Sequence, residues 1–170
     1  MENLMTPSTN LKNLRWLVLS LLVILFDQWT KDYFNHLLQP GQSIDLLPVF
    51  SWTLAYNTGA AFSFLHDAGG WQRWFFVVLA IGVSGGMTVW LTRLPDNAKL
   101  LMAAIALLVG GALGNVYDRF TLGYVIDFIH VHYQTWHFPA FNVADCGITV
   151  GAALLIIDSL FLEKKRQVTS

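Results

Sequence analysis

Charged residues are scarce in this 170-residue chain, because Asp, Glu, Lys and Arg together make up only 12% of it. Soluble domains carry about 25%. The net charge is −1, so the chain has no excess of basic residues with which to bind nucleic acid. Hydrophobic residues make up 55% of the chain. This composition disfavours a soluble enzyme and is typical of a small integral membrane protein.

Cysteine is almost absent as well. The single cysteine, Cys146, excludes an internal disulfide, and no Cys/His spacing matches a zinc site. Three histidines, His130, His132 and His137, lie close together without a His-Glu-x-x-His motif, so we interpret them as surface residues. No histidine or cation adjoins Cys146 to make a thiolate, so we expect a small buried residue there. We therefore predict neither a metal nor an organic cofactor.

Long apolar runs, in contrast, are abundant. A helix needs about 20 largely apolar residues to cross a membrane. Four segments meet this need: 14–34, 71–91, 98–116 and 141–162. The first follows Lys12 and Arg15 as a signal peptide would, but no small-x-small cleavage site comes after it, so we interpret it as a span. The predicted fold class is an all-α membrane protein with four transmembrane helices, with residues 1–170 as a single domain.

Charged residues are distributed asymmetrically around these segments. Seven of the ten basic residues fall on one side: Lys12, Arg15, Arg93, Lys99, Lys164, Lys165 and Arg166. Basic residues stay on the cytoplasmic side, so we expect both termini inside and the longer connections, 35–70 and 117–140, outside. Acidic residues gather at the outer side: Asp27, Asp32, Asp45, Asp67, Asp118, Asp127 and Asp145. So many carboxyl groups at one face indicate a functional site.

The outer connections contain strand-like patterns. Apolar and small polar residues alternate over 50–57, which is typical of a half-buried strand. That segment ends in the turn signal Asn57-Thr58-Gly59, before a short apolar run over 60–65. Residues 124–133 are β-branched and aromatic enough to form a second strand. We therefore add a small extracytoplasmic β element to the predicted fold.

Pairs of glycines four residues apart occur on three of the predicted spans. These pairs are Gly82 and Gly86, Gly110 and Gly114, and Gly147 and Gly151. Small residues one turn apart let helix backbones approach closely in a membrane. We predict that they pack helices against one another.

Several polar residues occur at membrane depth, where ionisable groups are expensive and functional by default. Asp27 and Lys31 are four residues apart and share one helix face, so they are able to pair. Two interpretations of this pair remain open: it is a neutralising ion pair, or it is part of a functional site. Asn115 and Asp118 also share a face, and we expect the adjacent Arg119 to hold Asp118 ionised.

Two other aspartates have no cation beside them in sequence. Asp145 lies one turn inside the last span, on the face of Asn142, and Asp127 lies mid-strand between apolar neighbours. Two carboxyls a few ångströms apart cannot both ionise, so one remains an acid while the other is a base. Such a base takes a proton from water as it attacks a carbonyl, and the acid hydrogen-bonds the carbonyl oxygen and later protonates the leaving amine. Asn57, Asn115 or Asn142 would help to hold the oxyanion.

The pattern leaves three functions open. One is an aspartyl peptidase that uses Asp127 and Asp145. The second is a proton-coupled small membrane transporter with the same acids as a relay, for which the inner half offers only Asp158, a residue without an assigned partner. The third is a membrane scaffold in which the acids are structural.

The chain resembles the bacterial lipoprotein signal peptidases, the signal peptidase II family, from about residue 15 to residue 160. Five ordered blocks carry the resemblance: Asp27-Gln28-x-Thr30-Lys31; Tyr56-Asn57-Thr58-Gly59-Ala60-Ala61-Phe62-Ser63; Gly111-x-x-Gly114-Asn115-x-x-Asp118-Arg119; Val125-x-Asp127-Phe128; and Phe138-Pro139-x-Phe141-Asn142-x-Ala144-Asp145. Cys146 stands where we expect serine or another small residue.

The resemblance implies an aspartic endopeptidase of the bacterial inner membrane, a target of the antibiotic globomycin, with its site at the outer face. Its substrates are diacylglyceryl-modified prolipoproteins, cut just before the lipidated cysteine, and membrane lipid is its other partner. The resemblance makes Asp127 and Asp145 the catalytic pair. Positions that bind substrate or support the site are Asp27, Lys31, Asn57, Gly59, Asn115, Asp118, Arg119 and Asn142. We expect a monomer without cofactors.

Overall fold

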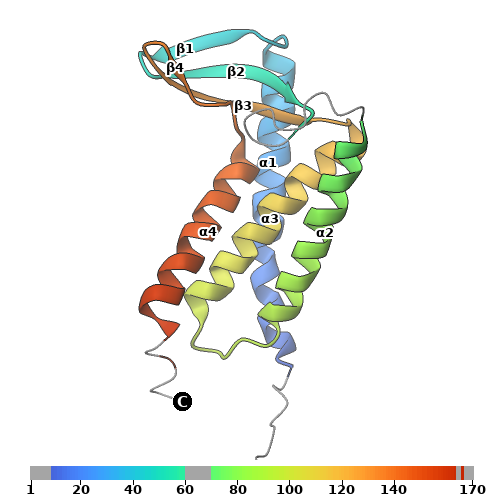
Figure 1. The fold of residues 1–170 in the computed structure, drawn as a ribbon, viewed down its shortest axis with the longest axis vertical. Helices are drawn as coiled ribbons and strands as arrows, with labels where there is room; N and C mark the ends of the chain where they lie inside the picture. Colours follow the sequence, from blue (N-terminus) through green and yellow to red (C-terminus); the bar gives the residue numbers. More distant parts are fainter. Residues whose placement is uncertain (1–8, 60–69, 164–165, 167–170) are drawn as a thin grey trace, which may run out of the picture.

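The computed structural model describes residues 9–59, 70–163 and 166. Within these residues, long helices run side by side and a small sheet covers one end of the bundle (Figure 1). The helices are α1 (Leu17–Leu37), which continues a short 3₁₀ helix η1 (Leu11–Trp16), α2 (Trp71–Leu91), α3 (Lys99–Thr121) and α4 (Val143–Phe161). The strands are β1 (Ser43–Leu47), β2 (Phe50–Asn57), β3 (Val125–Tyr133) and β4 (Trp136–His137).

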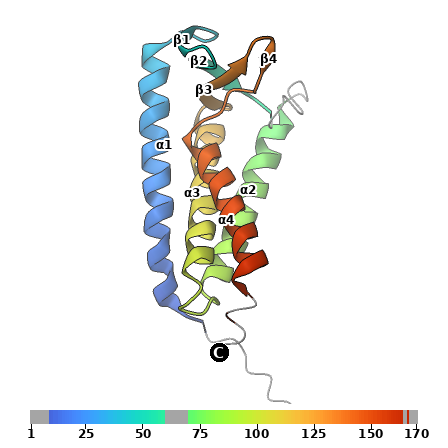
Figure 2. The same cartoon turned by 90° about the vertical axis from the view of Figure 1, so that its left-hand side faces the viewer.

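Helix α3 lies at the centre of the bundle, and the other helices pack around it (Figures 1 and 2). Its side chains Ala104, Ile105 and Ala106 are fully buried although they point in different directions around the helix. Small side chains such as these alanines let neighbouring helices approach α3 from several sides, which suits its central position.

Glycines allow α3 to approach its neighbours closely. A Cβ on Gly110 would lie 2.9 Å from the Ser20 backbone of α1, and one on Gly151 would lie 2.8 Å from the Ala104 carbonyl oxygen of α3. Packing is therefore confirmed for the glycine pairs of α3 and α4. It is wrong for the pair on α2, since a Cβ on Gly82 or Gly86 meets no described atom within 4 Å.

Three of the described helices, α2, α3 and α4, are long and apolar enough to cross a membrane. Helix α1 is as long as α2, but it carries three Asp or Lys side chains in the half nearer the sheet: Asp27, Lys31 and Asp32. Large apolar side chains are exposed on the outside of the bundle, including Leu22 of α1, Val78 of α2 and Leu160 of α4. An apolar exterior of this kind suits contact with lipid rather than water.

The sheet is antiparallel with the strand order β1-β2-β3-β4. The predicted strands over 50–57 and 124–133 are confirmed as β2 and β3, which pair with Asn57 opposite Val125. Strands β1 and β4 were not predicted. All five residues of β1 are exposed and β4 has two residues, so neither leaves a burial pattern in the sequence.

Aromatic packing fixes the sheet on the C-terminal end of α1. The ring of Phe34 stacks on Phe128 of β3 with centroids 4.4 Å apart, and it contacts Trp52 of β2 at 4.6 Å. The Tyr56 hydroxyl donates a hydrogen bond to Asn35 Oδ1 at 2.7 Å. Strand β3 is therefore held against the helices at a defined height, and Asp127 with it.

At the opposite end of the bundle, Asp158 of α4 has a partner that its sequence neighbourhood did not reveal. Both carboxylate oxygens accept hydrogen bonds from the Arg166 guanidinium, each at 2.6 Å. The aspartate is buried, so this two-point contact supplies the counter-charge that a buried carboxylate needs.

Candidate functional site

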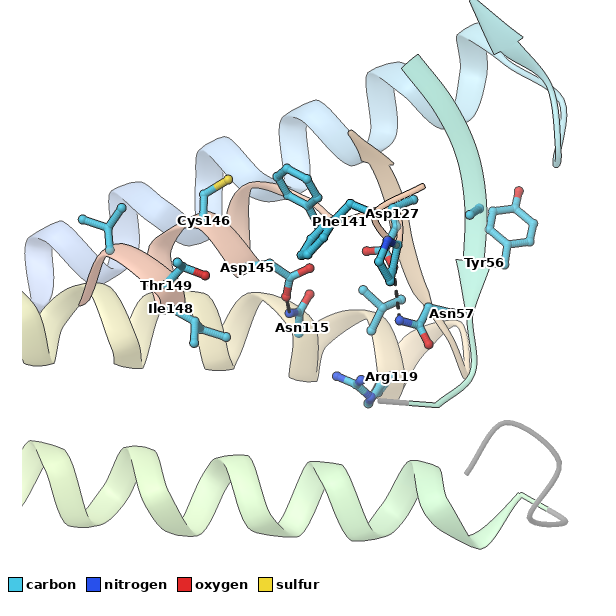
Figure 3. Close-up of a pocket in the computed structure, with 16 residues that line it drawn as sticks. Tyr56, Asn57, Asn115, Arg119, Asp127, Phe141, Asp145, Cys146, Ile148 and Thr149 are labelled. Carbon is cyan, nitrogen blue, oxygen red and sulfur yellow. Dashed lines mark hydrogen bonds between the residues drawn. The ribbon is translucent and has the colours of Figure 1, made fainter. Parts of the chain in front are cut away.

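A cavity of about 710 Å³ opens where β2 and β3 meet the ends of α3 and α4 that lie nearest the sheet (Figure 3). Asp127 of β3 and Asp145 of α4 both line it, and their carboxyl groups point toward one another in Figure 3. The remaining wall residues are Ala55, Tyr56, Asn57, Asn115, Arg119, Val125, Phe138, Pro139, Ala140, Phe141, Cys146, Ile148, Thr149 and Val150. Most of this wall is apolar, as is usual for a pocket that binds an organic ligand.

Asp127 is a buried carboxyl with two amide donors. It is 2% exposed. Its Oδ1 accepts a hydrogen bond from Asn142 Nδ2 at 2.7 Å, and its Oδ2 accepts one from Asn57 Nδ2 at 3.2 Å. Burial, and then repulsion by Asp145, raise the pKa of Asp127 to about 7. A proton is therefore retained on this carboxyl under mildly acidic conditions.

Asp145 lies in the first turn of α4 and forms a capping box with Asn142. The Asp145 backbone N–H donates to Asn142 Oδ1 at 2.9 Å, and the Asn142 backbone N–H donates to Asp145 Oδ2 at 3.3 Å. The helix begins here because these reciprocal bonds satisfy two of its free N–H groups. The other carboxylate oxygen of Asp145, Oδ1, accepts a hydrogen bond from Asn115 Nδ2 at 2.8 Å.

Asn142 and Asn115 connect the two aspartates. Asn142 Nδ2 donates to Asp127 Oδ1 and also to Asn115 Oδ1, the latter at 3.1 Å. The Oδ1 and the backbone N–H of Asn142 form the capping-box bonds with Asp145. Both amides therefore direct their NH₂ groups toward carboxylates. The aspartates are thus close enough to share hydrogen-bonding partners.

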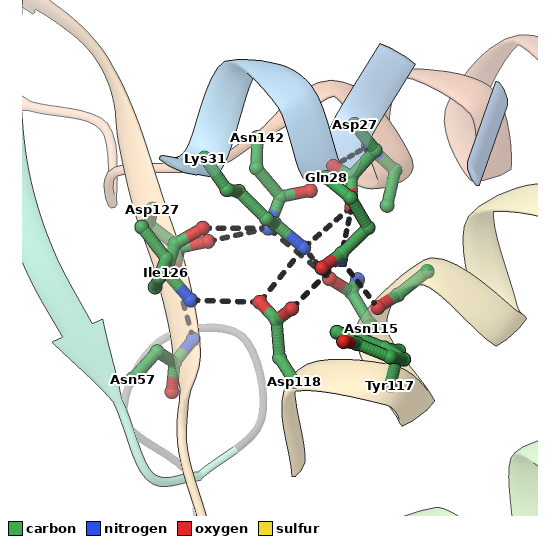
Figure 4. A network of polar contacts seen from close by, with 12 residues as sticks. Asp27, Gln28, Lys31, Asn57, Asn115, Tyr117, Asp118, Ile126, Asp127 and Asn142 are labelled. Atoms are coloured by element: carbon green, nitrogen blue, oxygen red, sulfur yellow. Dashed lines mark hydrogen bonds and ion pairs between the residues drawn. The ribbon is translucent and has the colours of Figure 1, made fainter. Parts of the chain in front are cut away.

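Lys31 is the centre of a buried network behind this pair (Figure 4). Its ammonium group lies 2.7 Å from Asp27 Oδ2 and 2.9 Å from Asp118 Oδ2. The predicted pairing of Asp27 with Lys31 is confirmed. The expectation that Arg119 holds Asp118 is wrong, because Lys31 occupies that position and Gln28 Nε2 donates to Asp118 Oδ1 at 2.8 Å.

Arg119 instead holds the turn after β2. Its Nη2 donates to the Gly59 carbonyl oxygen at 3.0 Å, and its guanidinium lies 5.1 Å from the centre of the Phe76 ring. The Gly59 N–H donates to Asn57 Oδ1 at 3.0 Å, which closes the turn. The last four residues of the sequence block that begins at Tyr56, residues 60–63, lie outside the described residues, and so does the whole apolar run over 60–65.

The residues singled out from the sequence fall into two layers. Those that line the cavity are Asn57, Asn115, Arg119, Asp127 and Asp145. Those that lie behind it, within the hydrogen-bond network, are Asp27, Lys31, Asp118 and Asn142. Gly59 stands at its edge through Arg119.

Sequence reasoning missed two contributors. Gln28 bridges Asp118 and the Gly114 carbonyl oxygen, and a polar amide at membrane depth beside Asp27 was the available signal. Cys146 was expected to be a small buried residue, but it is half-buried and lines the cavity. It follows Asp145 directly, so the start of α4 brings it to the same wall.

The three histidines lie together on the sheet, away from the cavity lining. Their ring centroids are 5.2 to 5.7 Å apart, and His130 Nδ1 lies 3.2 Å from Ser51 Oγ. His137 is exposed and the other two are partly exposed. Burial and the neighbouring imidazoles lower the pKa of His130. Among the residues that the structure describes, no group of three or more His, Cys, Asp or Glu side chains is placed to hold a metal ion.

Comparisons with known proteins agree with one another. The sequence model of the family described as "Signal peptidase (SPase) II" matches residues 19–161. A lipoprotein signal peptidase of Acinetobacter baylyi is 58% identical over 154 residues, which cover 91% of this chain and 86% of the relative. One of Pseudomonas fluorescens is 59% identical over 154 residues, with 89% and 90% covered.

Solved structures show the same fold. One, titled as a bacterial membrane enzyme at 2.3 Å resolution, has a TM-score of 0.78 and 30% identity, and the match covers 91% of this chain and 92% of that one. A second membrane enzyme, at 1.9 Å resolution, has a TM-score of 0.75 and 28% identity, with 93% and 99% covered. The family model matches residues 19–161, the relatives are more than half identical, and the solved structures share the fold. The chain therefore belongs to the signal peptidase II family.

Proposed function

We propose that this protein is an aspartic endopeptidase that removes the signal peptide from diacylglyceryl-modified prolipoproteins by cutting before the lipidated cysteine. The observation that carries the aspartic mechanism is the placement of Asp127 and Asp145 on one cavity wall with Asn142 bonded to both. Membership in the signal peptidase II family supports the substrate class.

In this proposal Asp127 is the acid and Asp145 the base. The raised pKa of Asp127 keeps a proton on it, while Asp145 lies in the first turn of α4, where the helix dipole favours a negative charge. Asp145 accepts a proton from a water molecule whose oxygen bonds to the scissile carbonyl carbon. Asp127 donates a hydrogen bond to the carbonyl oxygen and stabilises the negative charge that forms on it. The C–N bond then breaks as the amide nitrogen takes the proton from Asp127, and Asp145 retains the proton that it took from water.

The amides around the pair hold it in place. Asn57 and Asn142 donate to Asp127, and Asn115 donates to Asp145, so neither carboxyl is free to rotate away. The positive charge of Arg119 interacts favourably with both acids, and its bond to Gly59 holds the turn at the cavity edge. We assign Asp27, Lys31 and Asp118 to the support of this arrangement.

We further propose four membrane spans with both termini cytoplasmic and the cavity at the outer face. Helix α1 runs alongside the apolar helices over their length, although its outer half carries ionisable residues (Figure 2). Two of those residues, Asp27 and Lys31, face the interior and are almost fully buried, whereas Asp32 is exposed. A protein of the bacterial inner membrane, acting as a monomer, would meet its lipid-anchored substrates at this surface.

Cleavage of a synthetic lipopeptide with a diacylglyceryl-modified cysteine, by purified protein in detergent, tests the proposal. Asp127→Asn and Asp145→Asn should fold, and each should lose activity by at least about a thousandfold, since the carboxyls act as one unit. Asp45→Asn, an exposed acid on β1, is the matched control and should cleave normally. Cleavage at the normal rate by either dyad variant would overturn the aspartic mechanism.

A proton-coupled transporter with the same acids is the alternative. In the part of the chain that the structure describes, the one acid buried at the inner end, Asp158, is paired with Arg166 and lies at the far end of α4 from Asp145. A proton relay needs linked acids across the membrane. Liposomes that contain the protein should therefore not acidify under a pH gradient faster than empty ones, and faster acidification would favour transport.

A further inference from the structure

Lys31 makes more contacts than a neutralising cation needs. Its side chain is 2% exposed, and its ammonium group contacts Asp27 at 2.7 Å, Asp118 at 2.9 Å and Asn115 Oδ1 at 3.0 Å. An ammonium group has three hydrogen atoms to donate, so these three acceptors satisfy it. The acceptors come from two helices, α1 and α3 (Figure 4).

Each carboxylate bound by Lys31 also accepts a backbone hydrogen bond next to a dyad residue. Asp27 Oδ1 accepts from the Ala144 N–H at 2.8 Å, one residue before Asp145. Asp118 Oδ2 accepts from the Ile126 N–H at 3.1 Å, one residue before Asp127. One cation therefore joins the backbone of α4 and the backbone of β3 through two carboxylates.

The third contact fixes an amide. Lys31 has only donors, so the atom of Asn115 that faces it must be the oxygen. The NH₂ group of Asn115 is then directed to Asp145 Oδ1, at 2.8 Å. Lys31, together with the Asn142 Nδ2 that also donates to this oxygen, therefore sets the orientation of the amide and with it the donor to Asp145.

We infer that Lys31 is a positioning residue that sets the separation and orientation of Asp127 and Asp145 through Asp118–Ile126, Asp27–Ala144 and Asn115. This inference rests on the proposed function. Ion pairing alone does not require the arrangement, because one buried carboxylate would neutralise one lysine. Taking a second carboxylate out of water is costly, and here each of the two has a backbone partner beside the site.

Replacement of the cation tests the inference. Lys31→Met removes the ammonium group and keeps an unbranched chain of similar size up to the Cε position. We expect kcat for the lipopeptide to fall about a hundredfold with KM little changed, because a displacement of about 1 Å at the reacting groups is enough for such a loss. Asp32→Asn, the next residue on α1 with an exposed side chain, is the matched control and should have normal kcat.

The pH profile gives a readout that lost stability would not move. Asp127 is faced by Asp145 of α4, Lys31 of α1 and Arg119 of α3. The positive charge of Lys31 lowers the pKa of Asp127, so its removal should raise that pKa. The alkaline limb of kcat/KM should therefore move to higher pH in Lys31→Met. An unchanged kcat and an unchanged limb in a folded Lys31→Met protein would overturn the inference.

A second variant keeps the test valid if Lys31→Met does not fold. Lys31→Met with Asp118→Asn removes one positive and one negative charge, so the net charge of the buried group stays the same and no second carboxylate is left unpaired. We expect this double variant to fold and to retain the kcat loss. Normal kcat in it would overturn the inference. Activity of the dyad variants Asp127→Asn and Asp145→Asn would instead overturn the proposed function, so the two failures are distinguishable.

Discussion

Asn142 combines two tasks in one side chain. Its Oδ1 caps α4 and its Nδ2 donates to Asp127, so a change at this position affects both the helix and the site. An amide has its acceptor and its donors on separate atoms, so one atom serves the cap and the other serves the carboxyl. The two tasks are separable by substitution.

Asn142→Ala should lower both stability and activity. Loss of an N-cap costs about 1 kcal/mol, and loss of the donor leaves Asp127 held by Asn57 alone. Asn142→Ser retains a capping oxygen but does not extend far enough to bond Asp127. We expect the serine variant to recover the thermal midpoint of the wild type without its kcat, as measured by thermal unfolding in detergent and lipopeptide cleavage. Recovery of both properties by serine would show that the donor to Asp127 is dispensable.

Asp127 should make stability depend on pH. Its folded pKa of about 7 lies above the ordinary 3.8, so the folded state binds this proton more tightly than the unfolded state does. The stabilisation of the folded state by this proton is complete below pH 3.8 and is lost as pH rises toward 7. Its upper limit is about 4 kcal/mol. Asp127→Asn removes this dependence.

Thermal midpoints at pH 5 and pH 8 measure that effect. The wild type should lose more stability between these two values than Asp127→Asn does. An equal loss in both proteins would mean that Asp127 titrates in its ordinary range. Over the same interval, kcat/KM of the wild type should fall above about pH 7 as the acid loses its proton.

The catalytic candidates were predictable residue by residue, but their support was only partly so. Asp127 and Asp145 stood out because no cation adjoins either of them, and Asp27 and Lys31 because four residues separate them on a helix. The contact between Lys31 and Asp118 depends on how α1 and α3 are rotated against each other, which the local pattern does not contain. Neighbourhood in sequence therefore favoured Arg119, and packing selected Lys31.

Helix α4 is positioned by close contact with α3. A Cβ on Gly111 would overlap the Ala144 carbonyl oxygen and lie 2.8 Å from Ile148 Cγ1. The contact lies one residue from Asp145, so any displacement of α4 there moves the site as well.

Gly111→Ala should therefore destabilise the protein by about 1 to 3 kcal/mol, the usual cost of overpacking, and should lower kcat. Gly86→Ala on α2 is the matched control, since a Cβ there meets no described atom within 4 Å. Alanine favours a helix over glycine by up to about 1 kcal/mol, so the control should be as stable as the wild type or more so. Thermal unfolding of both variants decides the matter, and equal midpoints would contradict the packing seen here.

At the scale of elements, periodicity predicted the strands that pack on α1 and missed the others. Phe128 and Leu54 are buried, and they give β3 and β2 a recognisable apolar pattern. The edge strand β1 has no buried side, so it forms because β2 offers it backbone partners. The prediction that paired glycines pack helices together is correct for α3 and α4. The glycines of α2 have the same spacing, but no other described atom lies close enough to pack against them.

Over the whole molecule, acids and amides gather at the sheet end and basic residues at the other. This asymmetry is the basis for the proposed orientation in the membrane. A fluorescent protein fused after residue 170 should therefore fold and fluoresce in cells, whereas alkaline phosphatase inserted at the β3–β4 turn, next to Gln134, should be active. The reverse pattern would place the cavity on the cytoplasmic side and contradict the proposal.

The bond between Asp27 and the Ala144 N–H joins the first long helix of the chain to the last one. A ribosome delivers α1 long before α4, so an incomplete chain lacks the Ala144 N–H that bonds Asp27 and lacks Asp145, the second acid beside Asp127. Under the proposed mechanism, the pair of acids therefore assembles only after α4 has been synthesised. Nascent or truncated chains that lack α4 should accordingly be inert toward membrane-anchored precursors.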